Sequence, residues 1–329
     1  MKEIVFLNRN ANDWKEFEAL LVSKSDNIDK LGDLYIQLNN DLSYAKTFYP
    51  NSKLTAYLND LTIRAHQKIY RTKKEKKGRV LQFWREEFPL AIYKTRKYFI
   101  YSLLITIIST SIGWLSSAND ETFVRLIMGD AYVNMTEASI AKGDPMAVYK
   151  SADEMSMFLG ITLNNIKVSF IAFILGVLFS IGTGYILFTN GIMLGAFHYL
   201  MFKNGVLLHS MSVIWLHGTI EIFAIIVAGS AGILIGNSFL FPGTYKRAVS
   251  FTNGAKLATK IIVGLIPFFI IAGFIEGFIT RYSNMPIYIK IFIIGGSATL
   301  IVWYFFIYPI RINKKLNYDG KPIFNRESN

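Results

Sequence analysis

The sequence predicts an all-α protein: a polytopic transmembrane helical bundle of about six spans that follows an N-terminal cytoplasmic helical domain. Two observations predict this class. Hydrophobic residues make up 52% of the 329 positions and aromatic residues 15%, which is more than soluble domains usually contain. The charge is also uneven, because 19 of the 35 Lys and Arg residues precede residue 98. The remainder of the chain is therefore strongly apolar.

Residues 1–79 are predicted to form the cytoplasmic helical domain. Trp14 and Phe17 lie on one stripe of a first helix, and apolar residues recur at helical spacing over about 29–48. Pro50 follows this second helix as a stop signal, and a third helix is expected to begin near Ser52.

Residues 80–97 form an amphipathic, aromatic segment directly before the first apolar stretch. Such segments commonly rest in the membrane interface, so Phe83, Trp84 and Phe88 are expected in the headgroup layer. Packing of this segment against the soluble domain is the alternative.

Residues 98–310 are predicted to be the transmembrane domain. The first span, 98–115, is long enough to cross ~30 Å of hydrocarbon. An outer loop at 116–165 follows, with seven acidic and three basic residues and short helices of its own. The third span is expected to be short or re-entrant, and five spans plus a re-entrant loop is the alternative. The later spans are expected at 166–188, 189–202, 212–241, 258–280 and 287–308.

Basic residues predict the orientation. Residues 1–97, the loop 242–260 and the basic tail 311–329 carry an excess of Lys and Arg, which favours the cytoplasmic side. The protein is therefore expected to be a multi-pass protein of the cytoplasmic (inner) membrane with both termini in the cytoplasm. The net charge of +12 then reports orientation and contact with anionic membrane lipid, so lipid is an expected partner and nucleic acid is not.

Several kinds of chemistry are excluded or disfavoured. The chain has no cysteine, which removes disulfides, thiolate metal sites and cysteine nucleophiles. It also lacks an HExxH motif, a nucleophile elbow and a Walker phosphate loop. His198, His209, His217 and Glu221 offer enough ligand types for zinc, but not the spacing of a known motif. No catalytic residue, cofactor or metal site is therefore predicted, and the chain is not expected to be an enzyme.

Small residues mark helix faces that pack closely. At 100° per residue, His217 and Glu221 fall on the same line as a ladder of Ala and Gly that runs to residue 236. Small residues at this spacing let helix backbones approach each other in lipid. The predicted packing residues are Gly191, Gly195, Ala224, Ala228, Gly232, Gly236 and Gly273.

Two acidic residues lie inside apolar segments, where an ionised carboxylate is costly unless it is neutral, paired or hydrated. These are Glu221 and Glu276. We expect them to converge with Asn190, His198 and His217 in an intramembrane polar cluster. The alternative is a hydrogen-bonded latch that only holds the helices together.

Three stretches resemble a known family: Phe6-Leu-Asn-Arg-Asn10 followed by Trp14, the segment 189–195, and Leu216-His-Gly-Thr-Ile-Glu221 with the small residues of 228–232. Together they resemble the stage II sporulation protein M family of bacterial and archaeal membrane proteins. The family's namesake anchors a peptidoglycan-degrading complex. The long N-terminal region and outer loop resemble members of the non-sporulation type, so the resemblance implies a membrane protein of the cell envelope.

Two functions follow as expectations. The first is an integral membrane scaffold or anchor that recruits envelope or cytoplasmic proteins, in cell-envelope remodelling. The second is a transport permease or channel subunit that uses the buried Glu221 and Glu276. The sequence leaves open whether the chain forms a homo-oligomer.

Overall fold

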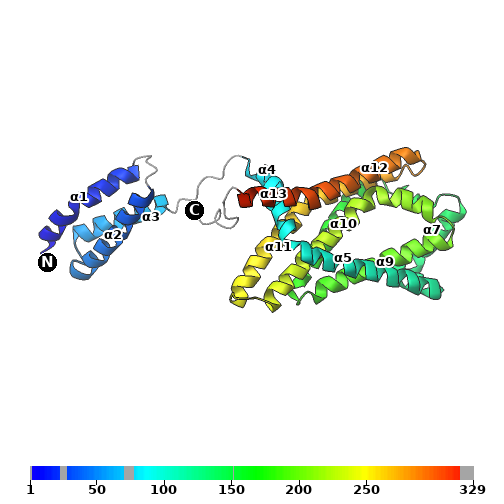
Figure 1. The fold of residues 1–329 in the computed structure, drawn as a ribbon, viewed down its shortest axis with the longest axis horizontal. Helices are drawn as coiled ribbons and strands as arrows, with labels where there is room; N and C mark the ends of the chain where they lie inside the picture. Colours follow the sequence, from blue (N-terminus) through cyan, green and yellow to red (C-terminus); the bar gives the residue numbers. More distant parts are fainter. Residues whose placement is uncertain (1, 23–27, 70–77, 151, 319–329) are drawn as a thin grey trace. The chain divides into compact units, whose positions relative to one another are not determined.

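A computed structural model describes residues 2–22, 28–69, 78–150 and 152–318. Every element in these ranges is helical, and they contain no strand, so the predicted all-α class is confirmed. The chain divides into two compact units, Met1–Lys77 and Gly78–Asn329 (Figure 1).

The N-terminal unit consists of three helices around a core of its own. They are α1 (Glu3–Val22), α2 (Ile28–Phe48) and α3 (Lys53–Ile69). The Trp14 Nε1 atom donates a hydrogen bond of 2.8 Å to the Asp41 Oδ2 atom, which ties α1 to α2. The buried apolar side chains of this core include Phe6, Trp14, Phe17, Leu38, Leu42, Leu58 and Leu61.

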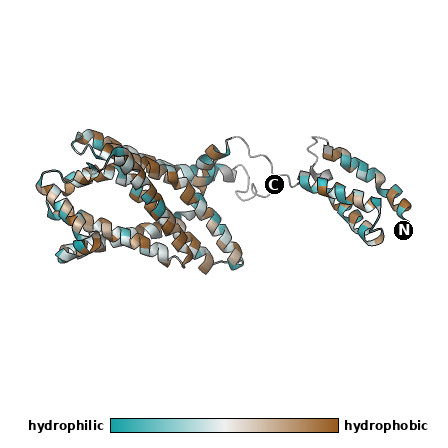
Figure 2. Ribbon diagram, turned by 180° about the vertical axis from the view of Figure 1, so that it is seen from behind, coloured by the Kyte–Doolittle hydropathy of each residue, from teal (hydrophilic) through white to brown (hydrophobic). Residues whose placement is uncertain are grey.

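The second unit contains six helices that are long and apolar enough to cross a membrane, among the residues that the structure describes. Much of their length is coloured as hydrophobic in Figure 2, and large apolar side chains such as Leu163 and Phe292 are exposed. The protein is therefore a multi-pass membrane protein. The spans are Arg79–Asn119, Glu154–Val177, Ile181–Lys203, Leu207–Leu240, Arg247–Thr280 and Ile287–Lys315.

Several spans combine more than one helical element. The elements are α4 (Arg79–Gln82), the π-helical η1 (Phe83–Glu87), α5 (Phe88–Asn119), α8 (Glu154–Ile174), the 3-10 turn η3 (Leu175–Val177), α9 (Ile181–Lys203), α10 (Leu207–Leu240), α11 (Arg247–Phe274), the π-helical η4 (Ile275–Thr280), α12 (Ile287–Ile301), the π-helical η5 (Val302–Ile307) and α13 (Tyr308–Tyr318).

Helix α10 lies at the centre of the membrane unit. It contacts α5, α8, α9, α11 and α12, and 67% of its apolar stretch is buried, against 17% for the first and last spans. Close approach depends on glycine: a Cβ atom at Gly232 would overlap the carbonyl oxygen of Ala172. The predicted packing residues are all buried, namely Gly191, Gly195, Ala224, Ala228, Gly232, Gly236 and Gly273.

The second and third spans differ from the predicted segments 166–188 and 189–202. The chain turns at Leu178–Ser180, inside the predicted second span, so α9 is a full-length helix of 23 residues rather than a short one. Phe179 and Ser180 have positive φ angles of 53° and 67°. The Ser180 hydroxyl donates to the Ile233 carbonyl oxygen at 3.0 Å, so a distant helix stabilises a turn that contains no Gly or Pro.

The predicted interfacial segment 80–97 is continuous with the first span, and several of its side chains pack against the bundle. Phe88 is fully buried beside Gly264, whereas Val80 and Leu81 are exposed. Trp84 donates to the Gly264 carbonyl oxygen at 3.2 Å, and Tyr304 donates to the Trp84 carbonyl oxygen at 2.6 Å. These bonds attach the segment to α11 and to η5.

The connection between the first two spans is helical, as expected for the 116–165 loop. It holds α6 (Glu121–Met128), α7 (Asp130–Ala141) and the 3-10 turn η2 (Ala147–Lys150). Residues 154–165 of the predicted loop belong to α8. Val124, Val133 and Met146 pack against residues of α9 and α10, which places this connection over the end of the bundle that contains the site below.

Candidate functional site

Helix α10 positions two ionisable side chains one turn apart. His217 and Glu221 lie at i and i+4, so both project from the same helix face. His217 is only 4% exposed. The ladder of small residues that begins at Ala224 lets α10 enter the centre of the bundle, and it thereby carries both side chains into the interior.

The π-helical segment η4 supplies the third side chain. It extends α11 and includes Glu276 and Thr280, both of which are buried. The Thr280 hydroxyl donates to the Ile275 carbonyl oxygen at 3.2 Å, five residues earlier, as the wider π turn allows. Such π-helical turns occur frequently at functional sites.

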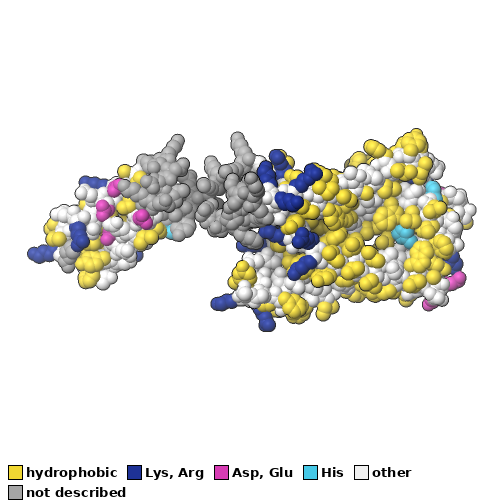
Figure 3. Space-filling model, in the orientation of Figure 1, with side chains coloured by type: hydrophobic (Ala, Val, Ile, Leu, Met, Phe, Trp, Pro, Cys, Tyr) yellow, Lys and Arg dark blue, Asp and Glu magenta, His cyan; other side chains and the backbone are white. Residues whose placement is uncertain are grey.

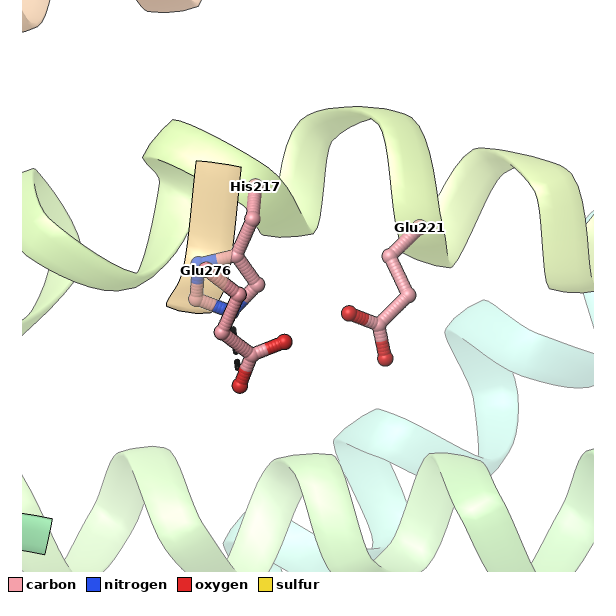
Figure 4. Close-up of side chains that lie close together, drawn as sticks. All are labelled: His217, Glu221 and Glu276. Carbon is pink, nitrogen blue, oxygen red and sulfur yellow. Dashed lines mark ion pairs between the residues drawn. The ribbon is translucent and has the colours of Figure 1, made fainter. Parts of the chain in front are cut away.

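The three side chains converge on one point (Figure 4). The His217 Nε2 atom lies 3.6 Å from the Glu276 Oε1 atom. One ligand atom from each of His217, Glu221 and Glu276 lies within 4.8 Å of those of the other two. The structure therefore brings together two carboxyl groups and one imidazole from two different spans. We call these three residues the His–Glu–Glu cluster.

Hydrogen bonding fixes the orientation of the imidazole. The His217 Nδ1 atom lies 3.0 Å from the Thr280 Oγ1 atom. Because the Thr280 hydroxyl already donates to a carbonyl, its oxygen can accept a hydrogen bond from the Nδ1–H group. This arrangement leaves the Nε2 lone pair directed at the carboxyl group of Glu276.

A cavity of about 150 Å³ adjoins the cluster between α5, α9 and α10. His217, Glu221 and Asn190 contribute to its lining, together with Thr106 and Gly218. The rest of the lining is mostly apolar, including Leu187, Met193 and Ile222, so these few polar groups are the ones that could hold water in a space of this size. The site therefore combines titratable groups with room for a small hydrated ligand.

The predicted polar cluster forms in part. Asn190 reaches the cavity, although its side-chain amide also donates to the Ile186 carbonyl oxygen at 2.8 Å. His198 lies apart from the group: its Nδ1 atom contacts the Leu194 carbonyl oxygen at 2.8 Å, and its ring centroid lies 6.4 Å from that of Trp215.

Two contributing residues were absent from the predicted set. Thr280 orients His217, and the Tyr149 ring packs edge-on against the imidazole with centroids 5.7 Å apart. Burial raises the pKa of the Tyr149 phenol well above its ordinary 10.0, so this side chain stays neutral. Tyr149 belongs to η2, and no sequence spacing relates this connection to α10.

A cluster of this kind can hold a positive charge. Two carboxylates this close repel each other strongly in a low-dielectric interior unless a proton or a cation neutralises them. The three residues that could ligate a metal ion are His217, Glu221 and Glu276.

Family comparisons agree with the two-unit division. Residues 4–71 match a family described as a domain of unknown function (DUF8413). Residues 102–281 match the family described as stage II sporulation protein M. No curated protein and no solved structure matches the chain. The stage II sporulation protein M match covers more than half of the chain and includes His217, Glu221 and Glu276, and the chain therefore belongs to the stage II sporulation protein M family.

Proposed function

We propose that the membrane unit is a transport or channel subunit that conducts protons or other cations past the His–Glu–Glu cluster. The observation that carries this proposal is the convergence of two carboxyl groups and an imidazole inside the bundle. Ionisable groups at membrane depth are costly, and they characteristically mark ion pathways and proton relays.

The adjoining cavity supports the same proposal. Glu221 and His217 line this space, and the Glu276 carboxyl group lies 3.6 Å from the His217 Nε2 atom and within reach of the Glu221 carboxyl group. A cation or proton that reaches Glu221 from the cavity can therefore pass to His217 or directly to Glu276. The chain's own groups thus provide three neighbouring positions.

We further propose that the basic end of the membrane unit faces the cytoplasm. Lys and Arg side chains gather at that end (Figure 3), and such an excess is typical of cytoplasmic segments. At the opposite end, basic residues are paired with acids, as in Lys203–Glu121 at 2.8 Å and Arg281–Glu154 at 2.7 Å. Both termini are then cytoplasmic. The basic residues of the cytoplasmic end include Arg79, Lys94, Arg96, Lys97, Lys246, Arg247, Lys256, Lys260, Arg311, Lys314 and Lys315.

This orientation places the cluster nearer the outer surface. Helix α10 begins at Leu207, at the end of the membrane unit opposite the basic end. His217 follows about 15 Å further along the helix. The cluster then lies beneath the helical connection that contains Tyr149, which would cover its outer side.

Flux measurements on the reconstituted full-length protein test the proposal. Liposomes that contain wild-type protein and a trapped pH indicator should take up protons faster than empty liposomes when a membrane potential is imposed. The Glu221→Gln variant should fall to the rate of empty liposomes, because the amide keeps the shape but cannot exchange a proton. Glu121→Gln is the matched control, since the Glu121 side chain is 82% exposed and outside the cluster.

Two outcomes would overturn the proposal. One is a wild-type rate equal to that of empty liposomes. The other is a Glu221→Gln rate equal to that of the wild type and of Glu121→Gln.

A scaffold or anchor role is the second candidate, and one observation favours it. The N-terminal unit has its own core and matches a family model separate from that of the membrane unit. A separately folded helical domain on a membrane unit is suited to recruiting a cytoplasmic protein. Crosslinking in cells should then capture a partner with the full-length chain that is lost when residues 2–69 are removed. Identical captured proteins for both forms would contradict this role.

A further inference from the structure

The His–Glu–Glu cluster also has the composition of a metal site, with ligand atoms within 4.8 Å of one another. The first observation that supports metal binding is the pairing of two acceptors. The Nε2 lone pair of His217 and the Glu276 Oε1 atom face each other at 3.6 Å, which is longer than a hydrogen bond. Ligand atoms that are each ~2.0–2.1 Å from a tetrahedral zinc ion lie about 3.3–3.4 Å apart. The separation therefore approaches that of two ligands of one metal ion.

A second, independent observation concerns the buried carboxyl group of Glu276. The other carboxylate oxygen of Glu276, Oε2, is buried and receives no hydrogen bond from an N–H or O–H donor of the described residues, although the Glu276 carboxyl group also lies within hydrogen-bonding reach of the Glu221 carboxyl group. Glu276 is only 9% exposed. A buried polar atom without a partner is costly, and a bound cation would remove that cost.

Charge balance favours a divalent ion. The two carboxylates together carry two negative charges, so one divalent cation makes the group neutral. A neutral site is far less costly at membrane depth than a charged one. A single proton would leave one negative charge on the pair.

The donor set selects the class of metal. One imidazole and two carboxylates are nitrogen and oxygen ligands, which suit Zn²⁺ and similar first-row ions better than Mg²⁺ or Ca²⁺. The imidazole is also held as a ligand requires, because its Nδ1 side is engaged by the Thr280 hydroxyl at 3.0 Å. Glu221 and His217 border the cavity, so a fourth position is open to water or to a passing ligand.

We propose that His217, Glu221 and Glu276 bind one divalent transition-metal ion of the Zn²⁺ class, with Thr280 as a positioning residue for His217. This proposal deepens the proposed function, since it names the cation that the same cluster would take. It concerns binding, however, and can be measured separately from flux.

Metal binding to the purified full-length protein provides the test. After treatment with a chelator and removal of that chelator, the wild type should bind one Zn²⁺ per chain. His217→Gln and Glu276→Gln should each lose this binding. His198→Gln is the matched control and should retain it, because His198 is a membrane histidine that lies apart from the cluster. Thr280→Val should weaken the affinity by about 10–100-fold, as loss of a group that orients a ligand does.

A second measurement on the wild type requires no variant to fold. Loading with Co²⁺ in place of Zn²⁺ should give the visible absorption of a four-coordinate Co²⁺ site. The inference is overturned if the wild type binds neither Zn²⁺ nor Co²⁺, or if His217→Gln binds Zn²⁺ as the wild type does.

The metal inference and the proposed function can fail separately. Proton flux that persists in chelator-treated protein without Zn²⁺ binding would overturn the metal inference and leave the proposed function standing. Stoichiometric Zn²⁺ binding without any proton or Zn²⁺ flux would support the metal site and overturn the transport role.

Discussion

Individual side chains in this protein show how burial changes the chemistry of polar groups. In the membrane unit, Glu276 and His217 approach each other at 3.6 Å in a buried interior, and His217 also lines a cavity of about 150 Å³. In the N-terminal unit, Asp41 accepts a hydrogen bond from Trp14 at the edge of an apolar core. Partial burial makes the ionised form of that carboxylate less favourable.

Asp41 gives a pH-dependent prediction for the N-terminal unit. Burial raises the pKa of Asp41 above its ordinary 3.8, although the Trp14 hydrogen bond opposes this. The folded state therefore binds a proton more tightly than the unfolded state does. The contribution of Asp41 to stability is present below pH 3.8 and is lost as pH rises through the raised pKa.

Urea unfolding of a fragment that covers residues 1–77 measures this effect by circular dichroism. Asp41→Asn should flatten the part of the pH dependence that begins near pH 3.8, and Asp60→Asn serves as an exposed control. An unchanged pH profile for Asp41→Asn would contradict the prediction.

The close packing of helices in the membrane unit depends on glycine residues, which have no side chain to separate the backbones. Helices α5 and α9 cross closely at Gly195, where a Cβ atom would overlap the Thr110 carbonyl oxygen and the Trp114 backbone nitrogen. Neither backbone atom can move without displacing α5. Gly296 in α12 has no heavy atom within 4 Å of the same position.

These two glycines form a matched pair for mutagenesis. Gly195→Ala should destabilise the membrane unit by about 1–3 kcal/mol through overpacking. Gly296→Ala should leave stability unchanged or raise it slightly, because alanine favours helix. Thermal unfolding in detergent should show a lowered Tm for the first variant only. Equal Tm values would mean that α5 and α9 do not pack as described.

The sequence was sufficient to predict the helical class and the buried faces, but not all of the boundaries. Apolar length and small residues at four-residue spacing indicated the spans and the packing faces, including that of Gly232 on α10. The turn at Phe179 and Ser180 could not be predicted, because it depends on a hydrogen bond to the distant Ile233 carbonyl oxygen. The turn residues themselves are neither Gly nor Pro, although Gly176 and Gly182 flank them.

The candidate site was predictable in its acids but not in its full composition. Glu221 and Glu276 are conspicuous as carboxyl groups in apolar segments, and the structure brings them together with His217. Thr280 and Tyr149 contribute through a π-helical turn and a connection that folds back over α10, neither of which has a simple periodicity. His198 shares a helix face with Gly191 and Gly195, yet it faces Trp215 instead of the cluster.

The molecule as a whole separates its charges between the two ends of the membrane unit, as Figure 3 shows for Lys and Arg. Because the natural chain has no cysteine, single cysteines can report which end faces outward. Lys142 lies in the connection between the first two spans, and Lys246 lies between α10 and α11; both are exposed.

An impermeant thiol reagent on intact cells should label Lys142→Cys but not Lys246→Cys. After permeabilisation, both variants should be labelled. Labelling of Lys246→Cys alone in intact cells would reverse the proposed orientation and move the cluster toward the cytoplasmic side.

The central claim is that the His–Glu–Glu cluster is a cation site rather than a structural latch. Infrared difference spectroscopy of the full-length protein tests it directly, because it distinguishes protonated carboxyl groups from carboxylates. Loading the wild type with Zn²⁺ should convert a protonated carboxyl signal into a metal-bound carboxylate signal, and the Glu221→Gln/Glu276→Gln double variant should show no such change. A wild-type spectrum that responds neither to Zn²⁺ nor to pH, or a response that persists in the double variant, would contradict the account.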